Sequence, residues 1–288
     1  MIIGRSPLRI SFGGGATDVP SYYEKYGGFC ISAAIDKYVY TTINNTTTNE
    51  IFLRYSQIEK VKNIIDIKHP IIREALLLTG IKDTNIEITS LADLPAGTGL
   101  GSSGSFTTAL LKTLHKFKKQ FISQEDLAEM ACHIEINLLK EPIGKQDQYI
   151  AACGGLTAFE FQTDGKVNPI TLNVSHDTLN LLEENLVMVS TGFHRSASKV
   201  LKEQDDKSKS SDKDMINNLH YVKEMGYRSL EALETGNLFN LGIIMNEHWL
   251  YKKKRSSSMS NPDIDSWYEL AMNNGAIGGK LIGAGGGG

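Results

Sequence analysis

The sequence is short of cysteine, of positive charge and of long apolar stretches. Its three cysteines, Cys30, Cys132 and Cys153, lie far apart and form no C-x-x-C pair, which favours buried small side chains over disulfides, zinc ligands or nucleophiles. The seven histidines show no metal-ligand spacing either. We therefore expect no zinc site held by protein side chains alone.

The chain also lacks a basic surplus. Its net charge is −3, whereas nucleic acid and anionic membranes usually attract proteins with excess positive charge. No apolar run reaches membrane-spanning length, and arginine and glycines stand where a signal peptide would have its apolar core. We expect a cytoplasmic protein that binds neither nucleic acid nor membranes, and the sequence leaves its oligomeric state open.

The chain is long enough to bury a substantial core, and its 288 residues predict two lobes. A hydrophobic share of 41% and a charged share of 22% are ordinary for a soluble globular protein. We place the boundary near residue 180, which gives an N-terminal lobe of residues 1–180 and a C-terminal lobe of residues 181–288.

Strand patterns dominate the N-terminal lobe, and helical patterns dominate the remainder. Strands are predicted at 8–12, 28–35, 38–44, 51–55, 85–91, 156–161, 167–172 and 186–190. Helices are predicted at 69–79, 102–118, 215–233, 238–251 and 262–273, with one more between Ser123 and Pro142. The charged run 202–214 (KEQDDKSKSSDKD) predicts a solvated loop, and the alternative is a mobile flap over the site.

The C-terminal segment 278–288 (GGKLIGAGGGG) has the pattern of a strand that enters a glycine-rich turn. A glycine run normally connects two elements, and no residue follows this one. We therefore expect either a truncated C-terminal lobe or an unstructured tail.

The strongest chemical signal is the segment 95–105, PAGTGLGSSGS, which lies between a strand pattern and an amphipathic helix pattern. Free N–H groups at a helix start attract anions, and glycines let the backbone wrap around phosphate oxygens. The serine hydroxyls can contact phosphate or a phosphate-bound magnesium ion. The residues predicted to bind ATP phosphates are Pro95, Gly97, Thr98, Gly99, Leu100, Gly101, Ser102, Ser103 and Gly104.

Two other glycine-rich phosphate loops are excluded by their spacing. A Walker A loop requires G-K-[ST], which is missing here. A Rossmann loop requires a different glycine spacing and a later acidic partner. A flexible linker remains as the alternative, but the patterned helix that follows directly disfavours it.

Three ordered motifs resemble those of a known family. They are RSPLRISFGGGATD at 5–18, PAGTGLGSSGS at 95–105 and KLIGAGGGG at 280–288. Together they are similar to the motifs of the galactokinase, homoserine kinase, mevalonate kinase and phosphomevalonate kinase superfamily (GHMP kinases), over nearly the whole chain. GGGATD, GKQDQY, TGFHRSAS and SNPDID look most like the D-glycero-D-manno-heptose 7-phosphate kinases of that family.

The resemblance implies an α+β fold with two lobes around the nucleotide and substrate. The N-terminal lobe would resemble ribosomal protein S5 domain 2, and the C-terminal lobe would be ferredoxin-like. ATP would be the phosphoryl donor and Mg²⁺ its counter-ion, held by Ser103 and Glu135. Asp147 would face the acceptor hydroxyl, Arg9 would stabilise charge on the transferring phosphoryl group, and Asp18 would bind sugar hydroxyls.

Each of these roles has a simpler alternative in the local sequence. Glu135 lies near the apolar stripe of its helix, where an unpaired carboxylate is costly, so either a metal ion or a structural ion pair would supply the missing charge. Asp147 also suits a helix cap or first turn. Arg9 also suits the surface of a strand.

The residues that end the first motif indicate the acceptor. Galactokinases carry a glutamate and a histidine just before T-D, where this chain has Gly15 and Ala16. The smaller uncharged pair leaves room for a longer or already phosphorylated sugar. The backbone N–H groups of residues 13–15, Gly14 and Gly15 among them, are available to bind an anion.

Several cations could hold a substrate phosphate, and they are Lys145, Arg195, Lys199 and Arg255. We favour Lys145 and Arg195 because they lie in site-like segments, and we expect Gly285 near the ATP phosphates and the acceptor. The predicted reaction phosphorylates the anomeric (C1) hydroxyl of a heptose 7-phosphate to the 1,7-bisphosphate, for cell-envelope polysaccharide. The alternatives are an L-fucose- or galactose-type sugar-1-kinase and a non-catalytic sugar or ATP sensor.

Overall fold

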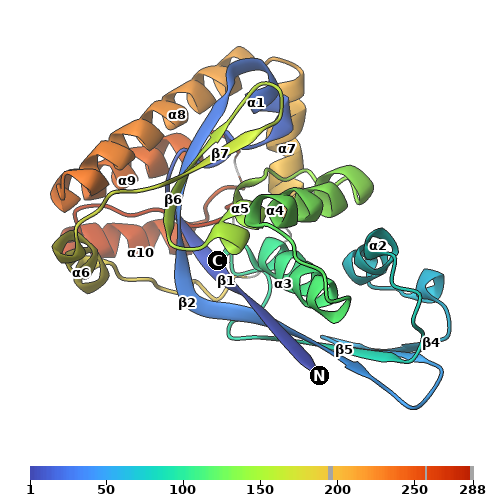
Figure 1. Cartoon of the computed structure of the whole chain (residues 1–288). Coiled ribbons are helices and arrows are strands. Elements are labelled where there is room, and N and C mark those ends of the chain that lie inside the picture. Colours follow the sequence, from blue (N-terminus) through green and yellow to red (C-terminus); the bar gives the residue numbers. More distant parts are fainter. Residues whose placement is uncertain (194–196, 257, 286–288) are drawn as a thin grey trace.

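The computed structural model describes residues 1–193, 197–256 and 258–285. These residues form one seven-stranded mixed sheet with helices on both of its faces (Figure 1). The strands are β1 (Ile2–Gly13), β2 (Gly28–Asn45), β3 (Ile51–Arg54), β4 (Ile58–Val61), β5 (Ile86–Ala92), β6 (Leu156–Phe161) and β7 (Val167–Thr171). The α-helices are α1 (Pro20–Tyr26), α2 (Pro70–Thr79), α3 (Ser102–Phe117), α4 (Gln124–Cys132), α5 (Gln146–Cys153), α6 (His176–Asn185), α7 (Ala197–Lys209), α8 (Lys213–Glu234), α9 (Leu238–Lys253) and α10 (Pro262–Asn273). A 3₁₀ turn, Ile64–Asp66, and a π-helical segment, η2 (His133–Leu138), complete the described elements.

The long strand β2 organises the sheet. It pairs antiparallel with β1 on one side, and on the other side its first half pairs with β6 and its second half with β5. β3 continues the sheet beyond β5 in parallel, β4 follows β3, and β7 follows β6. One strand therefore carries both halves of the N-terminal lobe.

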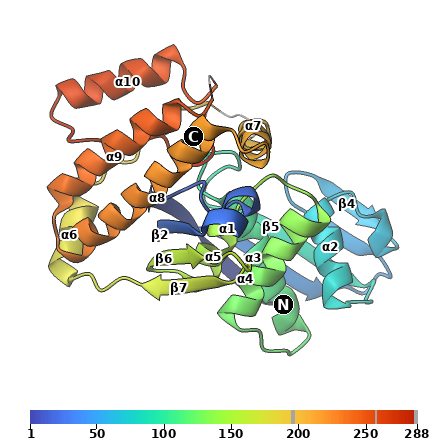
Figure 2. The same cartoon turned by 90° about the horizontal axis from the view of Figure 1, so that it is seen from above.

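Two helical layers bury the two faces of the sheet (Figure 2). On one face, α3 buries Leu110 and Leu114 in an apolar core with α2, α4 and the strands β3 and β5. On the other face, α8 and α9 pack on β1 and β2, where Val222 contributes to a second core with Phe12 and Phe29. α10 lies outside α9 in Figure 2. The amphipathic spacing of these helices accounts for both layers.

Local signals explain where several helices begin and end. The Ser123 hydroxyl accepts a hydrogen bond from the Asp126 N–H at 3.1 Å and so caps α4. Gly80 follows α2 in the left-handed conformation, with φ +65°. The helices predicted at 69–79, 102–118, 215–233, 238–251 and 262–273 are confirmed as α2, α3, α8, α9 and α10.

Three expectations for the pattern between residues 28 and 214 are wrong. The strands predicted at 28–35 and 38–44 are one continuous strand, which pairs with β1 before and after a register shift at the gap. Residues 186–190 form no strand: Val187 is 81% exposed, and no described strand lies beside it to pair its backbone. The charged run 202–214 is helical over most of its length, as α7 and the start of α8.

The run is helical because its charges pair at helical spacing and its other face is covered. Lys207 pairs with Glu203 and Lys209 with Asp205, each four residues apart. Gln204 and Ser208 are buried. The described residues after Thr171 consist of helices and irregular segments, and the expected strand at 278–285 is one of the latter. No helix among the described residues is both long and apolar enough to cross a membrane.

Candidate active site

A cavity of about 500 Å³ lies between the sheet with its first helical layer and the C-terminal helices. The N-terminal lobe contributes the start of α3, the start of α5 and the turn after β1. The C-terminal lobe contributes α7, the end of α9 and the segment 280–285. The volume is within the range of cavities that bind small molecules.

The predicted phosphate loop lies on the wall of this cavity. Gly97, Gly99 and Gly101 all have left-handed φ values of 73–83°, and the chain then enters α3 without a side-chain cap. The first N–H groups of α3 are therefore open to an anion. The loop residues that line the cavity are Ala96, Gly97, Gly99, Gly101, Ser102, Ser103 and Gly104.

Three residues of the predicted loop lie elsewhere. Leu100 is buried in the apolar core, and its carbonyl accepts a hydrogen bond from the Arg9 N–H at 3.0 Å. The Thr98 hydroxyl donates to the Pro95 carbonyl at 3.2 Å. These contacts shape the loop, and none of the three side chains is among the residues that line the cavity.

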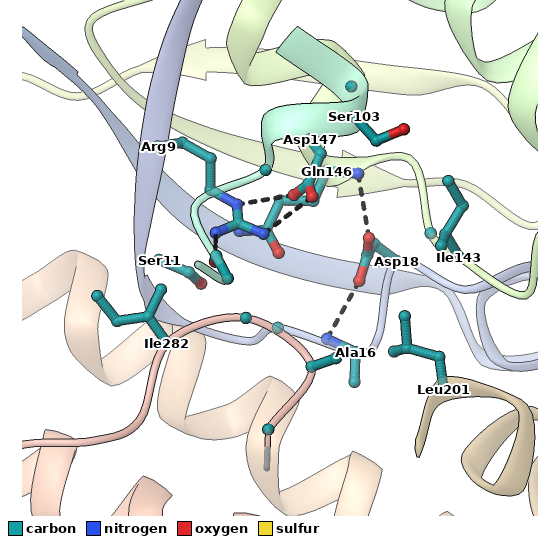
Figure 3. A pocket seen from close by; sticks show the side chains of 18 of the residues that line it. Arg9, Ser11, Ala16, Asp18, Ser103, Ile143, Gln146, Asp147, Leu201 and Ile282 are labelled. Atoms are coloured by element: carbon teal, nitrogen blue, oxygen red, sulfur yellow. Dashed lines mark hydrogen bonds and ion pairs between the residues drawn. The ribbon is translucent and has the colours of Figure 1, made fainter. Parts of the chain in front are cut away.

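Arg9 and Asp147 form a two-pronged ion pair at the centre of the site (Figure 3). The Arg9 Nε and Nη2 atoms lie 2.7 Å and 2.9 Å from the two carboxylate oxygens, and Nη1 donates to the Gly99 carbonyl at 2.6 Å. The β1–β2 register shifts between Pro7 and Arg9, and such an irregularity re-aims a side chain. One arginine therefore joins the phosphate loop to the first turn of α5.

The start of α3 lies directly against Asp147. A Cβ atom added to Gly104 would lie only 2.9 Å from the Asp147 Cβ. Any side chain at Gly104 would push the two helices apart. The glycine thus holds the carboxylate beside the helix start that is open to phosphate.

Asp18 holds the start of α5 beside the same cavity. Its Oδ1 accepts from the Ala16 N–H at 3.1 Å, and its Oδ2 accepts from the Gln146 N–H at 3.0 Å (Figure 3). Burial raises the pKa of Asp18, the N–H donors oppose this shift, and the nearby charge of Asp147 adds to it. Gly144 passes so close that an added Cβ would lie 1.9 Å from Oδ2.

A third carboxylate, Glu135, is 1% exposed in the π-helical segment η2. It accepts hydrogen bonds from the Ser103 hydroxyl and, at 2.8 Å, from Gln148 Nε2. Burial raises the pKa of Glu135 to about 7. The Gln148 Oε1 atom is buried with no hydrogen-bond partner among the described residues. The cluster thus offers four side-chain oxygens: two of Glu135, one of Ser103 and one of Gln148.

This cluster fits a magnesium ion. Mg²⁺ takes oxygen ligands, and it usually binds through one or two carboxylates together with substrate phosphates. Ser103 also lies in the first turn of the phosphate loop's helix, so a phosphate there would share the ion. Sequence reasoning missed Gln148, because a glutamine beside Asp147 carries no metal-ligand pattern of its own.

The opposite wall of the cavity carries two lysines, of which Lys252 is buried and Lys280 is half-buried. The Lys252 Nζ atom donates to the carbonyls of Leu281 at 2.8 Å and Gly283 at 2.5 Å. The Lys280 Nζ atom donates to the Phe12 carbonyl at 2.9 Å and lies 3.2 Å from His248 Nδ1. Burial lowers the pKa of Lys252 well below its usual range and that of Lys280 to about 7.

Arg255 completes this cationic wall and is 3% exposed. Its Nε donates to Asn218 Oδ1 at 2.9 Å, and its Nη1 donates to the Gly15 carbonyl at 3.4 Å. Burial lowers the pKa of Arg255 to about 10, and the charge of Asp18 opposes that shift. The sequence did not indicate Lys252 as a site residue, because the stretch KKKR resembles a run of solvent-exposed charges.

The other residues predicted to bind the substrate lie in different places. Gly15 and Gly285 line the cavity, whereas Gly14 lies against the Phe29 carbonyl. Lys145 does not line the cavity, because its Nζ pairs with Glu129 at 2.7 Å and donates to the Gly165 carbonyl at 2.8 Å. Arg195 lies outside the described residues.

A helix start open to phosphate, set against a carboxylate that can meet a hydroxyl, is the arrangement of a phosphotransferase. Comparison with models of known protein families indicates which kind of phosphotransferase this is. The GHMP kinases N terminal domain matches residues 61–155, and the GHMP kinases C terminal domain matches residues 229–288. The chain belongs to the GHMP kinase family and is an ATP-dependent phosphotransferase with an alcohol group as acceptor.

Individual relatives agree with this family. The D-glycero-alpha-D-manno-heptose 7-phosphate kinase of Campylobacter jejuni is 28% identical over 295 residues, which cover 99% of this chain and 86% of that protein. The bifunctional fucokinase/GDP-fucose pyrophosphorylase of Arabidopsis thaliana is 28% identical over 98% of this chain but only 29% of its own length.

A solved structure supports the fold. The crystal structure of a D-glycero-D-manno-heptose 1-phosphate kinase from Bacteroides thetaiotaomicron superposes with a TM-score of 0.81 at 25% identity, over 99% of this chain and 86% of that one. The two-lobed GHMP kinase fold predicted from the sequence is thereby confirmed.

Proposed function

We propose that this chain is a sugar kinase that transfers the γ-phosphate of ATP to the anomeric (C1) hydroxyl of D-glycero-D-manno-heptose 7-phosphate. The product is the 1,7-bisphosphate, an intermediate suited to nucleotide activation for cell-envelope polysaccharide. The observation that carries the proposal is the contact of Asp147 with the start of α3, which brings a carboxylate beside the expected position of the γ-phosphate. We also propose that the lobes divide near residue 180.

Residues of the N-terminal lobe carry out the separate parts of the proposed reaction. Asp147 orients the acceptor hydroxyl and accepts its proton as the new O–P bond forms and the bond from the γ-phosphorus to the ADP oxygen breaks. Arg9 holds Asp147 in place and offers positive charge to the phosphoryl oxygens. Asp18 fixes the start of α5 and presents its carboxylate to sugar hydroxyls.

The phosphates and their counter-ion have separate binding groups. The N–H groups of the loop 97–104 receive the ATP phosphates. Ser103 and Glu135 would hold Mg²⁺, which neutralises phosphate charge during transfer. The raised pKa of Glu135 has burial as its main cause, and a bound cation would restore the carboxylate form.

The heptose acceptor rests on the named relatives and on the room beside Gly15. The cavity wall there is formed by Gly15 and Ala16, which add little bulk and no charge. The relatives' names differ in the position of the phosphate, C7 in one and C1 in the other. The L-fucose-type alternative has the fucokinase relative in its favour.

An acceptor screen tests the proposal. The purified protein would be given Mg–ATP with heptose 7-phosphate, free heptose, galactose, L-fucose or mevalonate, and ADP release would be measured. We expect the highest kcat/KM with heptose 7-phosphate and no release without an acceptor. A preference for galactose, fucose or mevalonate would contradict the proposal, and ATP binding without turnover of any sugar would favour a sensor.

A further inference from the structure

Arg255 is a buried cation whose hydrogen bonds are incomplete. It follows the end of α9, and its side chain donates to two neutral acceptors, the Asn218 side chain and the Gly15 carbonyl. Its Nη2 atom is buried and has no hydrogen-bond partner among the described residues. A buried charged donor without an acceptor costs free energy.

A structural role explains only some of the interactions of the Arg255 side chain. The bonds from Nε and Nη1 connect α8 to the turn after β1 and would suit a strut between the lobes. They do not explain why Nη2 is left unpaired at the wall of a cavity that Arg255 lines. An anion in the cavity would satisfy the atom.

The position of Arg255 separates it from the phosphate loop. Its contacts are with Gly15, and the charge that most affects it is that of Asp18. Lys252, by contrast, holds the carbonyls of Leu281 and Gly283. That segment packs on the phosphate loop, because the Ile282 carbonyl would lie 2.8 Å from a Cβ added to Gly99.

We propose that Arg255 binds the phosphate monoester of the acceptor sugar, at the end of the sugar remote from the reacting hydroxyl. This rests on the proposed function for the identity of the sugar. The guanidinium presents Nη1 and Nη2 as a fork that matches two phosphate oxygens. Gly15 adds no side chain in front of the fork, and Lys252 and Lys280 add positive charge to the same wall.

The site also explains why Lys145 does not serve this purpose. Lys145 is already paired with Glu129, so a phosphate would have to compete with a carboxylate for it. Among the described residues, the hydrogen-bond partners of the Arg255 side chain are neutral. A phosphate dianion therefore gains more free energy by binding at Arg255 than by binding at Lys145.

Two substitutions at Arg255 and one control test the proposal. Arg255→Met removes the charge and keeps an apolar stem, and Arg255→Lys keeps the charge without the fork. Arg228→Met is the control, since Arg228 lies on α8, pairs with Glu247 and does not line the cavity. For each protein, kcat/KM would be measured with heptose 7-phosphate and with free heptose.

We expect Arg255→Met to lower kcat/KM for heptose 7-phosphate about 100-fold, because a charged hydrogen bond is lost. The same substitution should change kcat/KM for free heptose less than about 3-fold. For heptose 7-phosphate, the kcat/KM of Arg255→Lys should lie between those of Arg255→Met and the parent protein, and Arg228→Met should match the parent protein. Equal losses with both sugars would identify a strut. A raised KM for ATP with the sugar preference intact would assign Arg255 to the nucleotide.

A binding measurement keeps the inference testable if heptose 7-phosphate is not the acceptor. Inorganic phosphate would be titrated by calorimetry into protein saturated with Mg²⁺ and a non-hydrolysable ATP analogue. We expect binding to the parent protein that weakens at least about 10-fold in Arg255→Met and not in Arg228→Met. Equal phosphate binding by both variants would overturn the site, whereas Arg255-dependent binding without heptose turnover would refute the proposed acceptor alone.

Discussion

The two walls of the cavity differ in whether they contain an ion pair. The N-terminal wall, defined by Arg9, Asp18, Ser103, Glu135 and Asp147, contains the ion pair of Arg9 with Asp147, and its other two carboxylates accept hydrogen bonds from neutral donors. The C-terminal wall, defined by Lys252, Arg255 and Lys280, carries three cations, and among the described residues their hydrogen-bond partners are carbonyls, an amide and a histidine.

This difference shows which part of the cavity is fixed before a ligand binds. Arg9 and Asp147 hold each other in position, so the catalytic geometry that we propose needs no substrate to form. The C-terminal cations carry lowered pKa values because burial leaves their charge uncompensated. Under the proposed function, anionic substrates would supply that compensation.

Replacing Asp147 gives the largest expected effect and breaks the N-terminal wall at its reactive point. Asp147→Asn keeps an acceptor for Arg9 but removes the carboxylate that we propose takes the hydroxyl proton. We expect kcat to fall about 10³-fold with ATP affinity nearly unchanged. Steady-state kinetics and nucleotide titration measure the two quantities, with Asp164→Asn in an exposed turn as the control. Unchanged turnover would remove Asp147 from the chemistry.

The next largest effect tests whether the position of Asp18 matters. In Gly144→Ala the new Cβ would overlap Asp18 Oδ2 and displace the start of α5. We expect kcat/KM for the sugar to fall about 10²-fold, with an unchanged dissociation constant for ATP. Gly279→Ala is the matched control, because its nearest neighbour would lie 3.7 Å from the added Cβ. A variant with normal sugar kinetics would show that Asp18 only supports the fold.

A smaller effect is expected at the oxygen cluster. Glu135→Gln retains most of the shape but loses the negative charge beside Ser103. We expect the Mg²⁺ concentration for half-maximal rate to rise about 10- to 100-fold, with recovery of activity at high Mg²⁺. Glu125→Gln, at an exposed position of α4, should behave like the parent protein. A loss of activity that Mg²⁺ does not recover, with a normal Mg²⁺ requirement, would argue for a purely structural carboxylate.

The smallest effect on activity, and a direct probe of the C-terminal wall, concerns Lys280. Its pKa is about 7 in the folded protein and lies below that of the unfolded chain. The unfolded chain therefore binds more protons between pH 7 and 10.5, so Lys280 makes the folded state more stable as pH rises. Without phosphate or sulfate, Lys280→Met should exceed the parent protein in free energy of unfolding by about 2 to 4 kcal/mol near pH 6.5.

That stability difference should shrink as pH rises toward 9.5, and added sulfate should reduce it at low pH. Chemical denaturation across this pH range measures it, with the exposed Lys166→Met as the control. A difference independent of pH would mean that Lys280 is not a destabilising buried cation.

Much of the N-terminal lobe could be predicted from local pattern. α3 and the loop before it follow from glycines next to an amphipathic helix, and the caps at Ser123 and Gly80 are local signals. The continuity of strand β2 was not predictable, because Asp36 lies at a register shift in the pairing with β1, and no local pattern encodes that irregularity. The strand predicted at residues 186–190 is wrong for a different reason: these residues have strand propensity, but no described strand pairs with them.

The candidate site divides in the same manner. Arg9, Asp18, Ser103, Glu135 and Asp147 belong to motifs or to a polar position in an apolar stripe, and the structure brings them to one cavity. The cations of the other wall come from a lysine run and a segment before a glycine motif, which resemble solvent-exposed positions. Their burial depends on how α8, α9 and the segment 280–285 pack, and no local pattern encodes that packing.

One measurement bears most directly on the proposed reaction, and it is the ³¹P NMR spectrum of the product. The purified protein would be incubated with Mg–ATP and heptose 7-phosphate until ADP release stops. We expect two phosphate monoester signals on one sugar, with the new phosphorus coupled to the anomeric proton. A new phosphate at any other position, or no new signal while free galactose or fucose is phosphorylated at C1, would contradict the proposed acceptor.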